Sequence, residues 1–146
     1  MKWDTITWIF LHSFVQKVNE EYFLKNKNVL FNIITYICQN LPCPKCKKHA
    51  TEYLSQHNIR SCNNRQDLID YMWRFHNKVS VGLQKEVFSY DSLEVYKRAN
   101  FHNVCSLFFV KFAENFVYTA TMDSWLRKDV TKNLKKYFNH FWHQYV

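Results

Sequence analysis

Hydrophobic residues recur every three or four positions along most of this chain, which is the spacing of one face of an α-helix. The clearest stripe lies in residues 65–84 and contains Leu68, Met72, Phe75, Val79 and Leu83. The same spacing predicts further helices over residues 4–24, 28–39, 44–56, 92–100, 104–118 and 123–145. The pattern therefore predicts an all-α fold.

The scarcity of glycine and proline points to the same fold class. The 146 residues include one glycine, Gly82, and two prolines, Pro42 and Pro44. A β-sandwich or barrel needs a turn about every ten residues, and its turns are rich in these two residues. Rossmann and P-loop sites need several glycines where the backbone meets phosphate. We therefore exclude these folds and expect one mostly helical chain.

The charge balance is basic, but the positive charge is dispersed. Twenty Lys and Arg face twelve Asp and Glu, which gives a formal net charge of +8, yet no basic run is longer than two residues. This distribution is typical of a solvated surface, and we expect no nucleic-acid partner. The first apolar run is interrupted by Asp4 and His12, and no stretch of eighteen uncharged apolar residues follows. We therefore expect no signal peptide, no transmembrane segment and a cytoplasmic location.

The chain has five cysteines: Cys38, Cys43, Cys46, Cys62 and Cys105. An odd number cannot pair completely within one chain, and cytosolic cysteines are mostly reduced. We therefore expect these cysteines to carry out chemistry or to bind a metal.

A Cys-x-x-Cys motif at Cys43 and Cys46 is the strongest chemical signal. Proline follows Cys43, so the pair is expected at the start of the helix over residues 44–56. A helix N-terminus and nearby positive charge, here Lys45, Lys47 and Lys48, stabilise a thiolate. The motif therefore predicts thiol–disulfide exchange at this pair.

A zinc site is the alternative interpretation of the same motif. Cys43, Cys46, His49 and either His57 or Cys62 would supply four ligands, as in a small zinc-stabilised helical binding module. Structural zinc usually takes its ligands from two paired motifs, and Cys62 has no partner cysteine nearby. We therefore favour redox chemistry and expect no metal.

Three of the predicted helices carry a mixed polar and aromatic stripe. The stripes are Thr5, Trp8 and His12; Cys46, His49 and Tyr53; and Trp73, His76, Asn77 and Ser80. Each stripe alone is typical of a packed core histidine beside an aromatic ring. Together they predict a cavity between helices, lined by indole, imidazole and amide groups and one redox cysteine. A flavin fits such a cavity.

The order of these residues resembles a known family. The motifs are Trp8-x-x-Leu11-His12, Cys43-x-x-Cys46-x-x-His49, Trp73-x-x-His76-Asn77-x-Val79 and Leu83-x-Lys85. Over residues 3–98 the chain resembles the FAD-linked sulfhydryl oxidases of the Erv/ALR type, and residues 41–51 are especially similar to the thiol oxidases of poxviruses and other large cytoplasmic DNA viruses. The resemblance implies a four-helix bundle plus a short fifth helix in residues 1–100. Residues 101–146 would then form a C-terminal helical extension of unassigned role.

The resemblance also implies an activity. Electrons would pass from a protein dithiol through Cys43 and Cys46 to FAD and then to O2, giving H2O2. Cys43 would accept the incoming thiol and Cys46 would face the flavin. The FAD contacts would be Trp8, His12, His49, Tyr53, Trp73, His76, Asn77, Ser80 and Lys85, with Phe88 nearby.

The implied partners are protein dithiols, with a small thioredoxin- or glutaredoxin-like redox carrier among them, and a second copy of the chain in a homodimer. The implied location is the host cytoplasm or the virion if the chain is viral.

The chain departs from the family pattern at several positions. Ser80 stands where the family usually has asparagine, and Tyr90 stands where many members have a structural cysteine. A second Cys-x-x-Cys is missing, so any internal electron shuttle would have to use Cys38, Cys62 or Cys105. These departures leave open a further alternative, a flavin-less interaction protein on the same fold.

Overall fold

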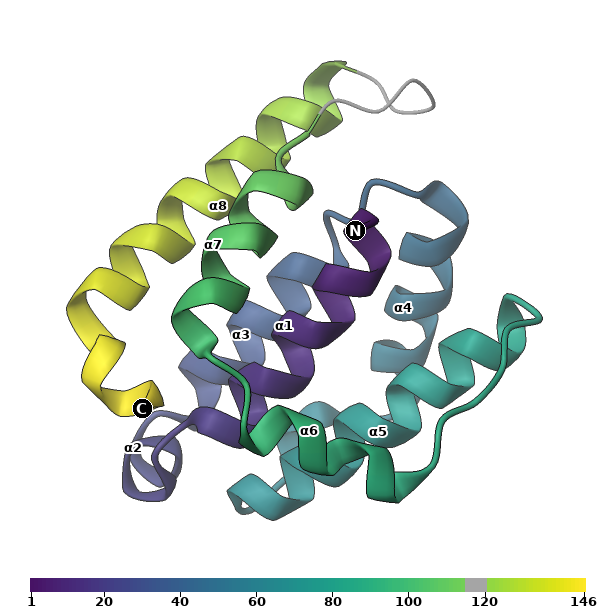
Figure 1. Ribbon diagram of the computed structural model, residues 1–146. Helices are drawn as coiled ribbons and strands as arrows, with labels where there is room; N and C mark the ends of the chain where they lie inside the picture. The colour runs from purple at the N-terminus through teal and green to yellow at the C-terminus, as the bar shows by residue number, and fades with distance from the viewer. Residues whose placement is uncertain (115–120) are drawn as a thin grey trace.

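The computed structural model describes residues 1–114 and 121–146, and the side chains of residues 1–114 and 125–146. Helices account for nearly all of the described chain (Figure 1). They are α1 (Trp3–Lys17), α2 (Glu20–Lys25), α3 (Lys27–Cys38), α4 (Pro44–Gln56), α5 (Arg65–Gly82), α6 (Glu94–Lys97), α7 (Phe101–Phe112) and α8 (Thr121–Phe141). The described chain also has three 3₁₀ segments: η1 (Ile59–Ser61) between α4 and α5, η2 (Tyr90–Leu93) before α6, and η3 (Trp142–Tyr145) after α8. The described residues contain no strand, which confirms the predicted all-α fold.

Helix α1 lies at the centre of the molecule (Figure 1). It packs against α5 on one side and along α7 on the other, while α4 packs against α3 and α5. Helix α8 lies outside α7, on the side of the molecule opposite α4 (Figure 1). Within the described ranges, no helix is long and apolar enough to cross a membrane.

The predicted helix over residues 4–24 is two helices, so that prediction is wrong in its length. Helix α1 ends at Lys17, and Val18 is extended. The Asn19 side chain then accepts a hydrogen bond of 3.0 Å from the Tyr22 N–H and caps α2. A capping asparagine offers the backbone an alternative to a continuous helix, although the hydrophobic spacing runs on.

Two later boundaries also differ from the prediction. The helix expected over residues 92–100 consists of η2 and α6 and ends at Lys97. Helix α7 begins earlier than expected because the Asn100 side chain accepts a hydrogen bond of 3.1 Å from the Asn103 N–H. Residues 115–118, the expected end of that helix, lie outside the described residues.

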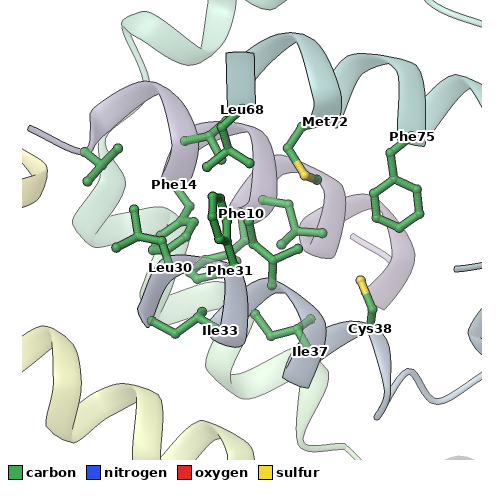
Figure 2. Close-up of a cluster of buried hydrophobic side chains, with 14 of the residues drawn as sticks. Phe10, Phe14, Leu30, Phe31, Ile33, Ile37, Cys38, Leu68, Met72 and Phe75 are labelled. Carbon is green, nitrogen blue, oxygen red and sulfur yellow. The ribbon is translucent and has the colours of Figure 1, made fainter. Parts of the chain in front are cut away.

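The hydrophobic core extends over both sides of α1. On the side of α3 and α5, large apolar side chains fill the space between the helices (Figure 2). They are Leu30, Phe31, Ile33, Ile37, Leu68, Met72 and Phe75, drawn with Phe10 and Phe14 of α1, whose rings also contact the side of α7 and α8. On the side of α7 and α8 the core is aromatic and contains Phe101, Phe108, Phe112, Phe138 and Tyr145.

The C-terminal extension packs closely on α1. The Phe10 and Phe108 rings stack with centroids 4.2 Å apart, and Phe14 stacks on Tyr145 at 5.3 Å. The end of the chain is also held by hydrogen bonds, because the Asn19 N–H donates to the Gln144 carbonyl at 2.7 Å. The aromatic face of α1 is therefore covered by this chain's own C-terminal helices.

Candidate functional site

The Cys43–Cys46 pair lies at the first turn of α4, as predicted. Cys43 is the N-cap, and its sulfur accepts a hydrogen bond of 3.3 Å from the Cys46 N–H. Pro44 occupies the first helical position, where its missing N–H costs nothing. None of the five cysteines, all of which the structure describes, is in a disulfide. The turn thus holds two thiols side by side at the end of a helix.

Cys46 does not behave as the helix N-terminus alone would suggest. Burial raises the pKa of the Cys46 thiol to about 12, and the hydrogen bond and electrostatic interaction with Cys43 add to this, while Lys85 lowers it. The thiolate stabilisation expected from the helix start is not found at Cys46, because burial disfavours the charged form of its thiol. The Cys46 thiol therefore holds its proton at pH 7.

Cys46 lies in the wall of a cavity of about 280 Å³ between α1, α4 and α5. The structure brings four other predicted cofactor residues into the same wall: Trp8, His76, Ser80 and Lys85. The rest of the wall is largely apolar, with Leu11, Phe75 and Leu83 among its side chains. Flat aromatic ligands bind in cavities of this composition.

His49 and Tyr53 line a second cavity of about 250 Å³ between α4 and α5. Val79 lines both cavities, so the two are neighbours along α5. Gly82, at the end of α5, lies against His49, and a Cβ at this glycine would stand 3.1 Å from the imidazole ring. The single glycine of the chain therefore permits the close approach of α4 and α5 at this cavity.

His12 lies beneath the first cavity and not in its wall. Its side chain is 1% exposed, and its Nε2 shares a hydrogen bond of 3.0 Å with Nδ1 of His76. His76 in turn stacks on Trp8 with centroids 4.0 Å apart. Burial lowers the pKa of His12 to about 3 and that of His76 to about 4, so both rings are neutral at pH 7. His12 therefore contacts the cavity through His76.

Trp73 and Asn77 hold the loop that follows α5. The Trp73 indole N–H and the Asn77 amide both donate to the Phe88 carbonyl at 3.1 Å, and the Phe88 N–H donates back to Asn77 at 3.0 Å. The Phe88 ring then lies 4.6 Å from the His76 ring. The structure thus places these two predicted cofactor residues behind the cavity, where they fix the residue that packs against His76.

Comparison with known proteins agrees with this geometry. The family model described as "Erv1 / Alr family" matches residues 5–102, well over half of the chain. The chain belongs to the Erv1 / Alr family. No solved structure matches it.

Two viral proteins are among its similar relatives. The chain is 31% identical over 84 residues to the "Putative FAD-linked sulfhydryl oxidase 096R" of Invertebrate iridescent virus 3, a match that covers 57% of each chain. It is 29% identical over 90 residues to the "FAD-linked sulfhydryl oxidase" of African swine fever virus (isolate Warthog/Namibia/Wart80/1980), which covers 62% of this chain and 75% of that protein. The chain thus spans little more than half the length of the iridovirus protein.

The residues of the site fit the flavin that membership of the Erv1 / Alr family implies. Trp8, stacked on His76, offers a flat aromatic surface, and Cys46 stands in the same wall. Ligand cavities usually measure about 300–1,000 Å³, so the first cavity is of a size for a ring system and not for a whole dinucleotide. The second cavity lies on the other side of Val79, and its His49 and Tyr53 side chains are available to the rest of the dinucleotide.

The zinc set considered from the sequence is not assembled. Among the described residues, no group of three or more His, Cys, Asp or Glu side chains could hold a metal ion. Cys62 lies instead in a small polar cavity with Asp67, Asp70 and Arg74. The comparisons with known proteins do not support the zinc-module alternative either.

Three of the residues that sequence reasoning missed in the first cavity lie beside residues that it predicted. Asp4 pairs with Lys85 at 3.1 Å, and Cys38 lies in the wall with Cys46. Tyr96 also lines the wall and stacks on His12 at 4.7 Å. The only signal for Asp4 was its place beside the Thr5–Trp8–His12 stripe, whereas Cys38 and Tyr96 are brought in by long-range packing.

Proposed function

We propose that this chain is an FAD-dependent thiol oxidase that forms disulfides in substrate proteins, with the overall reaction 2 R–SH + O2 → R–S–S–R + H2O2. One observation carries the proposal: the Cys43–Cys46 turn places Cys46 in the wall of the cavity that also holds Trp8 and His76. Membership of the Erv1 / Alr family and the names of the viral relatives support the same reaction.

Thiol exchange begins at Cys43, which lies outside the cavity wall. A substrate thiolate attacks the Cys43 sulfur of the Cys43–Cys46 disulfide, so a mixed disulfide forms and Cys46 leaves. Lys85 stabilises the negative charge as Cys46 departs, and burial then favours protonation of Cys46. A protonated Cys46 does not attack the mixed disulfide, so the reaction goes forward.

The second substrate thiolate then attacks the sulfur of the first substrate cysteine in the mixed disulfide with Cys43. The substrate disulfide forms, Cys43 is released as a thiolate, and two electrons now reside on the cysteine pair. When bound, FAD supplies the two-electron acceptor that returns the pair to the disulfide and reduces O2 to H2O2. Trp8 and His76 would hold the ring system, while His49, Tyr53, Ser80 and Lys85 would hold its polar parts.

Oxygen uptake with dithiothreitol tests this function. The wild-type protein is expected to consume O2 and to release H2O2. Cys43→Ser and Cys46→Ser are expected to stop turnover while the protein keeps its flavin. Cys105→Ala removes a buried cysteine of α7 that takes no part in the site, and it is the matched control that should stay active. Turnover by Cys46→Ser would contradict the proposal.

The partners and location rest on the resemblance. We propose protein dithiols as substrates, a small thioredoxin- or glutaredoxin-like carrier among them, a homodimer, and a place in the host cytoplasm or the virion. A dimer would have to use a surface other than the aromatic face of α1, because α7 covers that face. The mass of the protein in solution tests the homodimer, and a monomer at micromolar concentration would exclude it.

A further inference from the structure

Three lysines surround the point at which a substrate thiol must approach. Lys45, Lys47 and Lys48 lie in the first turn and a half of α4, and all three are exposed. A helix rises about 1.5 Å per residue, so these lysines lie within about 8 Å of Cys43 along the axis. This is shorter than the Debye length of about 10 Å at 0.1 M salt, so their charge acts directly on a partner at Cys43. We call these three lysines the basic rim.

The basic rim is not neutralised by the rest of the protein. Within the described residues, no acidic side chain forms an ion pair with any of the three. Of the two acidic residues in the neighbouring cavity wall, Asp4 is paired with Lys85 at 3.1 Å, which leaves Glu86. The only acidic residue on α4 is Glu52, one turn beyond Lys48 on the same face, and it forms no ion pair with that lysine. A surface with this excess of positive charge attracts an acidic partner.

Resting on the proposed function, we propose that the basic rim selects dithiol partners whose reactive cysteines are flanked by acidic side chains. Complementary charges at the edge of an interface raise the rate of encounter, and like charges suppress it. Acidic neighbours also disfavour the thiolate of a substrate cysteine, and the basic rim offsets this effect when the partner docks. The rim therefore favours such a partner in encounter, and in the exchange step at Cys43 it offsets the penalty that the partner's acidic side chains impose on its thiolate.

Two peptides with the same Cys-x-x-Cys centre test the inference, one flanked by glutamates and one by lysines. The readout is the ratio of their kcat/KM values, measured by O2 uptake. At about 0.01 M ionic strength, where the Debye length is about 30 Å, we expect the acidic peptide to be favoured at least about tenfold. At about 1 M, where the Debye length is about 3 Å, the ratio is expected to approach one.

Charge reversal tests whether the preference for the acidic peptide arises from the basic rim. The triple variant Lys45→Glu, Lys47→Glu, Lys48→Glu is expected to invert the ratio at low salt, and acidic residues in the first turn are compatible with the helix. The matched control is Lys128→Glu, Lys132→Glu, Lys136→Glu, which makes the same change of charge on the exposed face of α8, across the molecule (Figure 1). The control is expected to keep the wild-type ratio.

The peptide ratios and the oxidation of dithiothreitol distinguish failure of the inference from failure of the proposed function. Three results would each overturn the inference. The first is equal kcat/KM values for the two peptides at low salt. The others are a kcat/KM ratio that the rim variant leaves unchanged, and a ratio that the α8 variant changes as much as the rim variant does. If the wild-type protein oxidises dithiothreitol and one of these results is found, only the inference fails. If it does not oxidise dithiothreitol at all, the proposed function fails, and the inference with it.

Discussion

Two buried histidines set the electrostatic character of the site at the residue scale. His12 and His76 share one hydrogen bond and lie among the rings of Trp8, Phe88 and Tyr96. Neither is charged at pH 7, because burial disfavours the imidazolium of both. A neutral His76 can therefore present either a donor or an acceptor to a ligand in the cavity.

This pair predicts a pH dependence of stability. In the unfolded chain each histidine binds a proton below about pH 6.5, whereas the pKa values in the fold are about 3 and about 4. The unfolded state therefore binds more protons between pH 6.5 and pH 4, and the free energy of unfolding falls as the pH falls. The loss between pH 7 and pH 5 is expected to be about 2 kcal/mol per histidine.

Denaturant unfolding across this pH range measures the effect. The double variant His12→Gln, His76→Gln should have a flatter pH dependence than the wild type, whatever its absolute stability. His143→Gln, at an exposed position, is the control and should keep the wild-type slope. A double variant with an unchanged slope would show that the pair is not buried in its neutral form.

The sequence could predict which residues line the cavity better than it could predict contacts between residues distant in the chain. Cys46, Trp8 and His76 could be predicted to line one cavity because each lies on a mixed polar and aromatic stripe of its own helix. The ion pair of Asp4 with Lys85 could not, because 81 positions separate the two residues and only the packed fold brings them together.

At the element scale, the N-terminus of α4 depends on the same residue that carries out the exchange. The sulfur of Cys43 satisfies the Cys46 N–H, which would otherwise lack a partner at the helix start. Redox function and helix capping are therefore joined in one side chain.

Substitution can separate these two roles. Cys43→Ser removes the redox sulfur but keeps a capping group, since serine is a preferred N-cap residue. Cys43→Ala removes both and is expected to cost about 1 kcal/mol of stability relative to Cys43→Ser. Thermal unfolding of the two inactive variants measures the difference. Equal stability of the two variants would show that the side chain of residue 43 does not cap α4.

Helix existence could be predicted better than helix ends. The start of α4 was found because proline follows the cap, a local signal. The break between α1 and α2 was missed because Asn19 can either continue a helix or cap the next one, and the contact with Gln144 that accompanies the break is remote in sequence.

The whole molecule depends on the packing of its C-terminal helices against α1. The Phe108 side chain is fully buried against Phe10, whereas Val110, two residues later on α7, is 62% exposed. The covering of α1 could not be predicted from the sequence, because the helical spacing of its aromatic residues does not specify which helix packs on them.

Phe108→Ala is expected to destabilise the protein by about 3–5 kcal/mol, since it leaves a cavity in the aromatic core. Val110→Ala is the matched control on the same helix and is expected to change stability by less than about 0.5 kcal/mol. Urea unfolding of both variants tests whether α7 is part of the cooperative fold. A small effect of Phe108→Ala would show that α1 does not need this cover.

The visible absorption spectrum of the purified protein, recorded before and after addition of dithiothreitol in a closed cuvette, tests the central claim most directly. A flavin-containing oxidase should be yellow, should bleach once the dissolved O2 is consumed, and should regain its colour when air is admitted. This cycle requires the bound flavin, the Cys43–Cys46 pair and the reaction with O2 together. A colourless protein would contradict the account and favour a flavin-less interaction protein on the same fold. A yellow protein that dithiothreitol does not bleach would contradict the redox role of the Cys43–Cys46 pair.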